Sequence, residues 1–244
     1  MFNIPSVVVA TIGALVLVHA VRTLGLSPRD NIQLLLLFSF IPARYDSSLL
    51  APDTVPGGWG ADIWTFVSYA FIHGDWIHLG LNSIWLLAFG SAVARRFGAT
   101  RFLAFFAITA AAGAGVHLLA HAGDVWPMVG ASAAISGYMA AAMRFVFQAG
   151  GPLGWMGGGT GAYHTPAAPL TAALRNPNVL VFLGVWFGLN LLFGASSFSL
   201  ADEGQSIAWQ AHIGGFLAGL LLFPVFDPIG PRPHADAGGE GAAP

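Results

Sequence analysis

The sequence contains no cysteine and no lysine, and only 8% of its 244 residues are charged. The lack of cysteine excludes disulfides and thiol chemistry. A soluble domain carries about 25% charged residues, so this chain has too little polar material to cover a surface that faces water. Its net charge of -2 is not that of a nucleic-acid-binding protein. With 56% hydrophobic residues and a mean hydropathy of +0.71, the chain is predicted to be an integral membrane protein.

Six apolar segments are predicted to cross the lipid bilayer as helices. A hydrocarbon core of about 30 Å needs about 20 residues of helix, and continuous rather than alternating apolar runs favour helices over a barrel. The first segment lacks the basic start of a signal peptide and is interpreted as a retained span. The fold class is therefore an all-α membrane protein with a bundle of six transmembrane helices. The expected spans are residues 5–24, 75–97, 101–121, 130–148, 178–200 and 206–226.

The connection after the first span is long, and we expect it to be partly embedded. Residues 32–41 form an apolar run of ten residues, which is too short to cross the bilayer. Turn-forming residues follow as far as residue 62. Residues 149–178 are rich in glycine and proline and are expected to form a flexible loop. We expect residues 1–226 to form a single membrane domain and residues 227–244 to form a disordered tail.

The nine arginines predict the orientation of the chain, because cytoplasmic loops of membrane proteins carry an excess of basic residues. With both termini in the cytoplasm, three arginines lie on the outer side, at positions 22, 29 and 44. This bias favours cytoplasmic termini, and spans two, four and six then all begin at the outer face. The arginines on the inner side are Arg95, Arg96, Arg101, Arg144, Arg175 and Arg232.

The polar residues of spans two, four and six point to nucleophilic catalysis. Polar and ionisable residues inside a membrane are costly, so their positions are functional hypotheses. His78 and Asn82 share a helical face, while Ser132 and His212 lie near the starts of spans four and six. A serine hydroxyl needs a base, and His212 is the obvious one. The developing oxyanion would find donors in His78, Asn82 and the backbone N–H of Ser132. No carboxylate lies inside these spans apart from Asp75 at the rim of span two, so the sequence supports a Ser-His dyad.

Small residues are expected to bring the serine and the histidine together. Gly215 and Gly219 on span six have the spacing of a membrane helix-packing motif. Close packing of spans four and six would place the histidine beside the serine. The small residues that span four offers are Ala133, Ser136, Gly137 and Ala140.

Three motifs together resemble those of the rhomboid family of intramembrane serine proteases, of bacterial type. A His-x4-His-x3-Asn pattern stands at His73, His78 and Asn82, a Gly-x-Ser motif at residues 130–132, and an Ala-His-x-Gly-Gly motif at residues 211–215. Their order and spacing match from about residue 30 to residue 223. Each motif alone is weak evidence, and the resemblance rests on all three.

The resemblance implies a six-helix core in which Ser132 attacks a peptide bond and His212 is the general base. It implies a substrate that is itself a membrane-spanning segment, bent into the site past the fifth span. The expected setting is the lipid bilayer of a bacterial inner membrane, with the active site opening to the outer face. Neither a cofactor nor a metal is expected, and no nucleic acid. The residues that would border the oxyanion and the substrate are His78, Asn82, Gly130 and His73.

The sequence departs from the family pattern at three positions. The residue after the nucleophile is usually glycine and here is Ala133, whose methyl group is expected to narrow the oxyanion site. Four residues after the serine, some members have an aromatic residue that stacks on the histidine, and this chain has Ser136. The first loop commonly has a Trp-Arg pair, and here Trp64 is followed by Thr65. None of these changes removes a catalytic atom.

Two other functions are compatible with the sequence. One is a catalytically impaired rhomboid-like protein that binds membrane segments, although the intact Ser132 and His212 argue against it. The other is a metal- or ion-handling protein, because His117 and His121 have the i, i+4 spacing of metal ligands, with Asp124 beyond them.

Two aromatic residues of the fifth span have alternative interpretations. Trp186 is interpreted as an aromatic residue near a span end, where tryptophan is common without any function. Alternatively, Phe182 and Trp186 form a gate through which the substrate enters.

Overall fold

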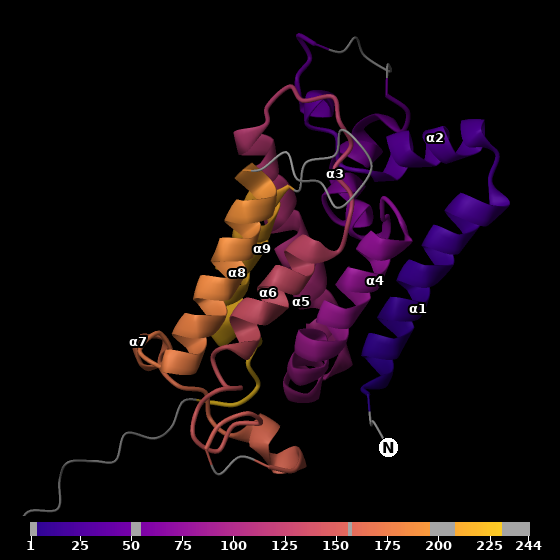
Figure 1. Ribbon diagram of the computed structural model, residues 1–244. Coiled ribbons are helices and arrows are strands. Elements are labelled where there is room, and N and C mark those ends of the chain that lie inside the picture. Colours follow the sequence, from indigo (N-terminus) through magenta and orange to yellow (C-terminus); the bar gives the residue numbers. More distant parts are fainter. Residues whose placement is uncertain (1–3, 50–54, 156–157, 196–207, 231–244) are drawn as a thin grey trace, which may run out of the picture.

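The structure, a computed structural model, describes residues 4–49, 55–155, 158–195 and 208–230. In this part of the chain the regular elements are all helices, and the pairing of Phe40 with Met128 is an isolated bridge. The long helices stand side by side in a bundle, and α2 (Pro28–Phe38) lies across one end of it (Figure 1). The predicted all-α fold class is confirmed.

Six stretches of this bundle correspond to the predicted spans. Helix α1 (Ser6–Ala20) continues as a π-helical turn, Val21–Gly25. Helix α4 (Trp76–Trp85) continues through a second π-helical turn, Leu86–Gly90, into α5 (Ser91–Ala120). Within α5 the backbone of Gly98 is not helical, with φ of 75° and ψ of 169°, so the chain turns there. One span therefore runs from α4 to the residue before Gly98, and the next span is the rest of α5. The other three are α6 (Ser132–Ala142), α8 (Pro177–Ala195) and α9 (Trp209–Phe226).

The spans differ in length. By length and composition, Ser6–Gly25, Trp76–Ala120 and Trp209–Phe226 can cross a membrane, and Pro177–Leu192 is a shorter apolar helix. Helix α6 has eleven residues, fewer than expected, and every residue after its first is buried. It ends early because the backbone N–H groups of Arg144 and Phe145 donate to carbonyls three residues back rather than four, which tightens the last turn.

The first connection contains α2 and a further helix, α3, which the sequence patterns did not predict. Helix α2 begins at Pro28, and Ser27 caps it by accepting a hydrogen bond from the N–H of Asp30 at 3.2 Å. Helix α3 (Gly58–Ser68) follows a 3-10 turn, Pro42–Tyr45. The indole of Trp64 on α3 donates to the carbonyl of Leu37 at 2.8 Å, which fixes α3 against α2.

Helices α6 and α9 pack at the centre of the bundle through small residues. A Cβ atom added to Gly215 would strike the carbonyl group of Ala133, and one added to Gly219 would strike the backbone of Gly137. Such contacts leave room only for glycine, so the two backbones approach each other closely. This is the packing that the spacing of the glycines predicts.

At the opposite end of the bundle from α2, a buried ion pair joins α5 to the end of α9. The guanidinium of Arg96 donates to both carboxylate oxygens of Asp227 at 2.8 Å, and to the carbonyls of Tyr163 and Thr165 at 2.9 and 2.8 Å. Two residues of the loop expected at 149–178, Tyr163 and Thr165, are therefore tied to α5 by hydrogen bonds. The loop contains a 3-10 turn, Thr160–His164, and the short helix α7, Leu170–Ala173. Residues 231–244 of the expected disordered tail lie outside the described residues.

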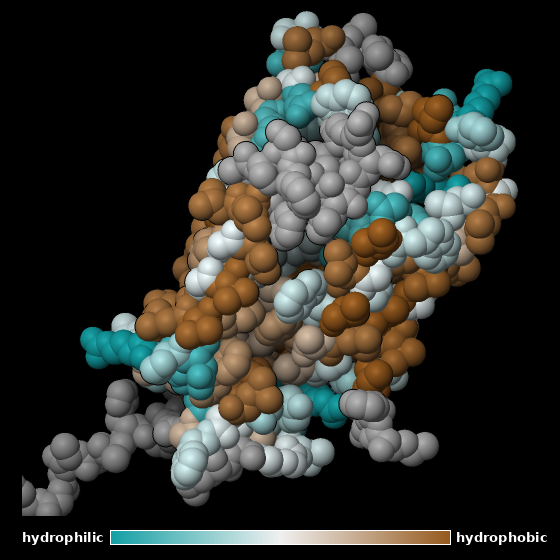
Figure 2. All heavy atoms as spheres, viewed as in Figure 1, coloured by the Kyte–Doolittle hydropathy of each residue, from teal (hydrophilic) through white to brown (hydrophobic). Residues whose placement is uncertain are grey.

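Apolar side chains cover the flanks of the bundle. Figure 2 shows hydrophobic residues over α8 and α1, while hydrophilic residues gather toward the two ends. A soluble protein does not expose a belt of this extent, but a lipid-facing surface does. The exposed apolar residues include Val9, Leu17, Val181, Leu191, Leu221 and Val225.

Candidate active site

The structure brings Ser132 and His212 into contact. Ser132 is the first residue of α6, and His212 lies in the first turn of α9, which begins at Trp209. The Ser132 Oγ and the His212 Nε2 are 2.7 Å apart. The sequence predicts the start of this span at residue 206, which lies outside the described residues.

The loop before α6 enters the bundle and places the serine there. Phe40 and Met128 exchange two backbone hydrogen bonds of 3.1 and 2.8 Å, and the N–H of Gly130 donates to the carbonyl of Tyr69 at 3.1 Å. Gly130 has a φ of 120°, which favours glycine. A Cβ atom there would lie 2.7 Å from the Nε2 of His78, so a side chain would also collide with the imidazole. Gly130 therefore lies between the serine turn and His78.

His78 is held with its Nε2 toward this turn. Asp75 caps α4, because its Oδ1 accepts from the backbone N–H of His78 at 2.7 Å. The Nδ1 of His78 accepts from the N–H of Gly74 at 3.4 Å. A neutral imidazole that accepts at Nδ1 carries its proton at Nε2. The Nε2 of His78, which faces Gly130, is therefore a hydrogen-bond donor.

The other two residues of the first motif, Asn82 and His73, have different surroundings. Asn82 is buried one turn along α4, and its amide nitrogen donates to the carbonyl of His78 at 3.0 Å. An amide nitrogen has two hydrogens, so Asn82 has a second one to donate. His73 is fully buried, and its ring centroid lies 5.1 Å from that of His78. Its carbonyl accepts from Arg22 at 2.7 Å. His73 therefore contacts His78 rather than the serine, and it packs behind the site instead of lining it.

A third polar side chain meets His212, and the sequence patterns did not single it out. The His212 Nδ1 lies 2.6 Å from the Oδ1 of Asn190 on α8. The amide nitrogen of Asn190 donates to the carbonyl of Trp186 at 2.8 Å. Asn190 is the one polar residue in the apolar run at 179–192, and a polar residue in such a run was the available signal.

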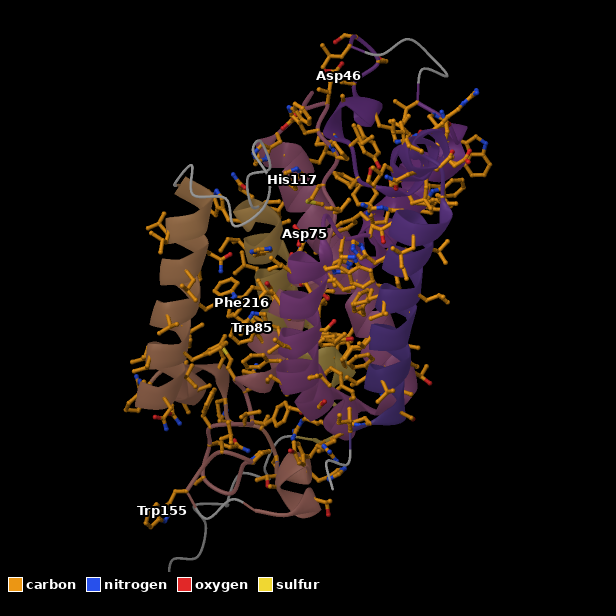
Figure 3. All side chains as sticks on the ribbon, turned by 45° about the vertical axis from the view of Figure 1, so that its right-hand side comes forward. Asp46, Asp75, Trp85, His117, Trp155 and Phe216 are labelled. Atoms are coloured by element: carbon orange, nitrogen blue, oxygen red, sulfur yellow. The ribbon has the colours of Figure 1, made fainter. Side chains whose placement is uncertain are left out.

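The two proposed gate residues make different contacts. The ring of Phe182 lies 5.3 Å from that of Phe89 and 6.1 Å from that of Phe147. Trp186 is 8% exposed and stacks on Phe216 at 4.6 Å. Figure 3 shows Phe216 between α8 and α4. Trp186 lies in the middle of α8, so its interpretation as a residue near a span end is wrong.

The positions that depart from the family pattern are accommodated locally. A Cβ atom on Gly113 of α5 would lie 2.5 Å from the Cβ of Ala133, so the extra methyl group faces a glycine rather than His78. The Ser136 hydroxyl donates to the carbonyl of Ser132 at 2.8 Å, one turn back on α6. Thr65 is buried in the first connection and donates to the carbonyl of Ala61 at 2.6 Å.

The histidine pair at the end of α5 has no third ligand among the described residues. The rings of His117 and His121 stack at 4.4 Å, and Figure 3 places His117 near the end of α5. The Asp124 carboxylate instead accepts from the backbone N–H of Trp126 at 3.0 Å. Among the described residues, no three His, Cys, Asp or Glu side chains are grouped to hold a metal ion.

Comparison with known proteins identifies the family. The model of the Rhomboid domain matches residues 60–227, well over half of the 244-residue chain. The matched range contains all three motifs and agrees with the apolar helices of an integral membrane protein. A comparison with curated proteins returns no match. On the strength of the domain match, the chain belongs to the rhomboid family.

Proposed function

We propose that the protein is an intramembrane serine endopeptidase that cleaves transmembrane segments of other membrane proteins. The observation that carries the proposal is the 2.7 Å contact between the Ser132 Oγ and the His212 Nε2. Membership of a family of intramembrane proteases supports it. A serine hydroxyl beside an imidazole nitrogen is the pairing that nucleophilic acyl transfer needs.

In the first half of the reaction, the Ser132 Oγ attacks the carbonyl carbon of the scissile peptide bond while the His212 Nε2 takes the hydroxyl proton. The tetrahedral intermediate then collapses, the C–N bond breaks, and His212 gives the proton to the leaving amine. In the second half, a water molecule attacks the acyl ester with the same histidine as base. This releases the new carboxyl end and restores the serine.

The oxyanion of the intermediate has donors on two helices. The first backbone N–H groups of a helix have no partner within the helix, and no side chain caps α6. These groups lie at the positive end of the helix dipole, beside the nucleophile. The Nε2 of His78 and the amide of Asn82 supply further donors from α4. This assigns to His78 and Asn82 the role of binding the oxyanion.

Substrate entry is proposed to occur between α4 and α8. The ring contact of Phe182 with Phe89 joins α8 to the turn that continues α4, so parting of these rings would open the bundle toward lipid. Phe182 and Trp186 then act as the gate. In this proposal Phe182→Ala changes the cleavage rate of a transmembrane substrate but not the reactivity of Ser132 toward a small probe. An unchanged cleavage rate would remove Phe182 from the gate.

The proposed location is a bacterial inner membrane with both termini in the cytoplasm. In Figure 1, α1 begins and α9 ends at the same end of the bundle. Arg96 lies near that end through its pair with Asp227, which follows α9 directly. Basic residues favour the cytoplasmic side. Ser132 and His212 begin their helices from the other end, so the site opens toward the outer face.

Cleavage of a model transmembrane substrate in liposomes tests the function. We expect cleavage by the native protein and by Ser136→Ala, a matched serine on the same helix, but none by Ser132→Ala or His212→Ala. Melting temperatures in detergent check that each variant is folded. Cleavage that persists in Ser132→Ala or His212→Ala would rule out the dyad. A native protein that binds the substrate without cleaving it would support the alternative, a catalytically impaired relative.

A further inference from the structure

The general base has a second hydrogen-bond partner, on a helix that carries neither the serine nor the histidine. We propose that Asn190 of α8 is a positioning residue that holds His212 in the tautomer and ring orientation that a general base requires. This inference rests on the proposed function and extends the dyad to a Ser-His-Asn arrangement. Asn190 acts through His212 and has no contact with the serine among the contacts of the described residues.

The orientation of the Asn190 amide follows from its two contacts. One end of the amide lies 2.8 Å from the carbonyl oxygen of Trp186, and only the amide nitrogen can donate there. The other end, 2.6 Å from the His212 Nδ1, must then be the oxygen. An amide oxygen only accepts, so the proton of the neutral imidazole lies on Nδ1.

This tautomer leaves a lone pair on the opposite nitrogen. The His212 Nε2 is 2.7 Å from the Ser132 Oγ, so it is free to accept the serine proton. In the other tautomer, Nε2 would carry a hydrogen and could not act as a base. Asn190 therefore favours the form of His212 that can react.

A stacked pair one turn away fixes Asn190 in place. Trp186 precedes Asn190 by four residues on α8, and Phe216 follows His212 by four residues on α9. The indole of Trp186 stacks on Phe216 at 4.6 Å. Helices α8 and α9 therefore contact each other at two successive turns, through the apolar pair Trp186–Phe216 and the polar pair Asn190–His212. Asn190 is 9% exposed. A buried and packed amide is preorganised and loses little freedom when it orients the histidine.

Among the residues that the structure describes, no other side chain provides this support. The Ser136 hydroxyl donates its hydrogen bond to the carbonyl of Ser132 at 2.8 Å. No aromatic ring of the described residues contacts the imidazole of His212, and the nearby ring of Phe216 stacks on Trp186. Without Asn190, the Nδ1 hydrogen of His212 would lack its acceptor, and the ring would be free to turn or to change tautomer. The orientation of the base thus depends on α8 remaining against α9.

Kinetics of Asn190 variants test the proposal. We expect Asn190→Ala to lower kcat by about 10- to 100-fold with KM little changed, because it removes the partner of the base and not a substrate contact. Asn190→Asp keeps an acceptor oxygen at this position and should restore most of the rate. Asn178→Ala, at an exposed asparagine near the start of the same helix, is the matched control and should react like the native protein. Equal kcat in Asn190→Ala and the native protein would overturn the proposal.

The tautomer of His212 gives a readout that does not require activity. In protein labelled with ¹⁵N-histidine, we expect the native His212 to show a protonated Nδ1, with the signal assigned by its loss in His212→Ala. Asn190→Ala should shift the signal toward the other tautomer or a mixture, and Asn190→Asp should not. A native protein without cleavage would refute the proposed function, while the tautomer still decides the role of Asn190. The same tautomer in Asn190→Ala and the native protein would overturn that role.

Discussion

Replacing Gly215 with alanine is expected to pull Ser132 and His212 apart. Gly215 lies three residues after His212 on α9 and faces the backbone of Ala133, next to Ser132. An added Cβ atom would lie 2.7 Å from the carbonyl carbon of Ala133 and 3.1 Å from its Cα. Carbon atoms pack at about 3.5–4.0 Å, so α6 and α9 must separate locally by about 1 Å.

A separation of this size affects the rate more than the fold. It would lengthen the 2.7 Å contact between the Ser132 Oγ and the His212 Nε2 beyond hydrogen-bond range. A misplacement of about 1 Å in catalytic geometry costs about 100-fold in rate. Overpacking itself costs about 1–3 kcal/mol in the free energy of unfolding. We therefore expect Gly215→Ala to be folded but less stable, and about 100-fold slower.

The rate at which a fluorophosphonate modifies the protein measures this effect without a transmembrane substrate, and thermal unfolding in detergent measures the stability. Gly13→Ala is the matched control. A Cβ atom added to Gly13 on α1 has nothing within 4 Å, so this variant should react at the native rate and be no less stable. A Gly215→Ala protein that reacts at the native rate would show that the added methyl group does not separate Ser132 from His212.

Two further substitutions test the support of the site. Asp227→Ala leaves the buried guanidinium of Arg96 without its carboxylate and should lower the free energy of unfolding by about 3–5 kcal/mol, measured by denaturation in detergent. Arg175→Ala, at an exposed arginine, should cost little, and equal stability of both variants would argue against the ion pair. Gly130→Ala places a side chain at a φ of 120° and 2.7 Å from the Nε2 of His78, so it should abolish modification of the serine. A folded Gly130→Ala protein that reacts at the native rate would contradict the placement of His78.

Much of the fold could be predicted because its determinants are continuous in the sequence. The apolar runs indicate the spans, and the glycine spacing on α9 predicts its contact with α6. Helix α3 was missed because it is too short to span the membrane and begins at Gly58, after Gly57 with a φ of 102°, rather than at a capping residue. Its position depends on contacts with α2, such as that of Trp64 with Leu37, which no local pattern reveals.

In the candidate site, too, some residues can be identified from local sequence patterns, while others depend on how the helices pack. Ser132 and His212 are ionisable or nucleophilic residues at the starts of apolar helices, so chemistry alone singles them out. Asn190 is neutral and lies far along the fifth span, and its importance depends on which residue of α9 lies at the same depth. That depth follows from the packing of two helices, which is known only once the chain is folded. For the same reason the direction of the Ala133 methyl group, toward Gly113, could not be predicted from its position beside the serine.

We expect Ser132, activated by His212, to be the nucleophile. Mass spectrometry of the native protein in liposomes after fluorophosphonate treatment tests it most directly, because it identifies the modified residue without a known substrate. The expected result is a single adduct on Ser132 in the native protein, and no adduct on the same peptide in His212→Ala. An adduct on a different residue, or undiminished modification of Ser132 in His212→Ala, would contradict it.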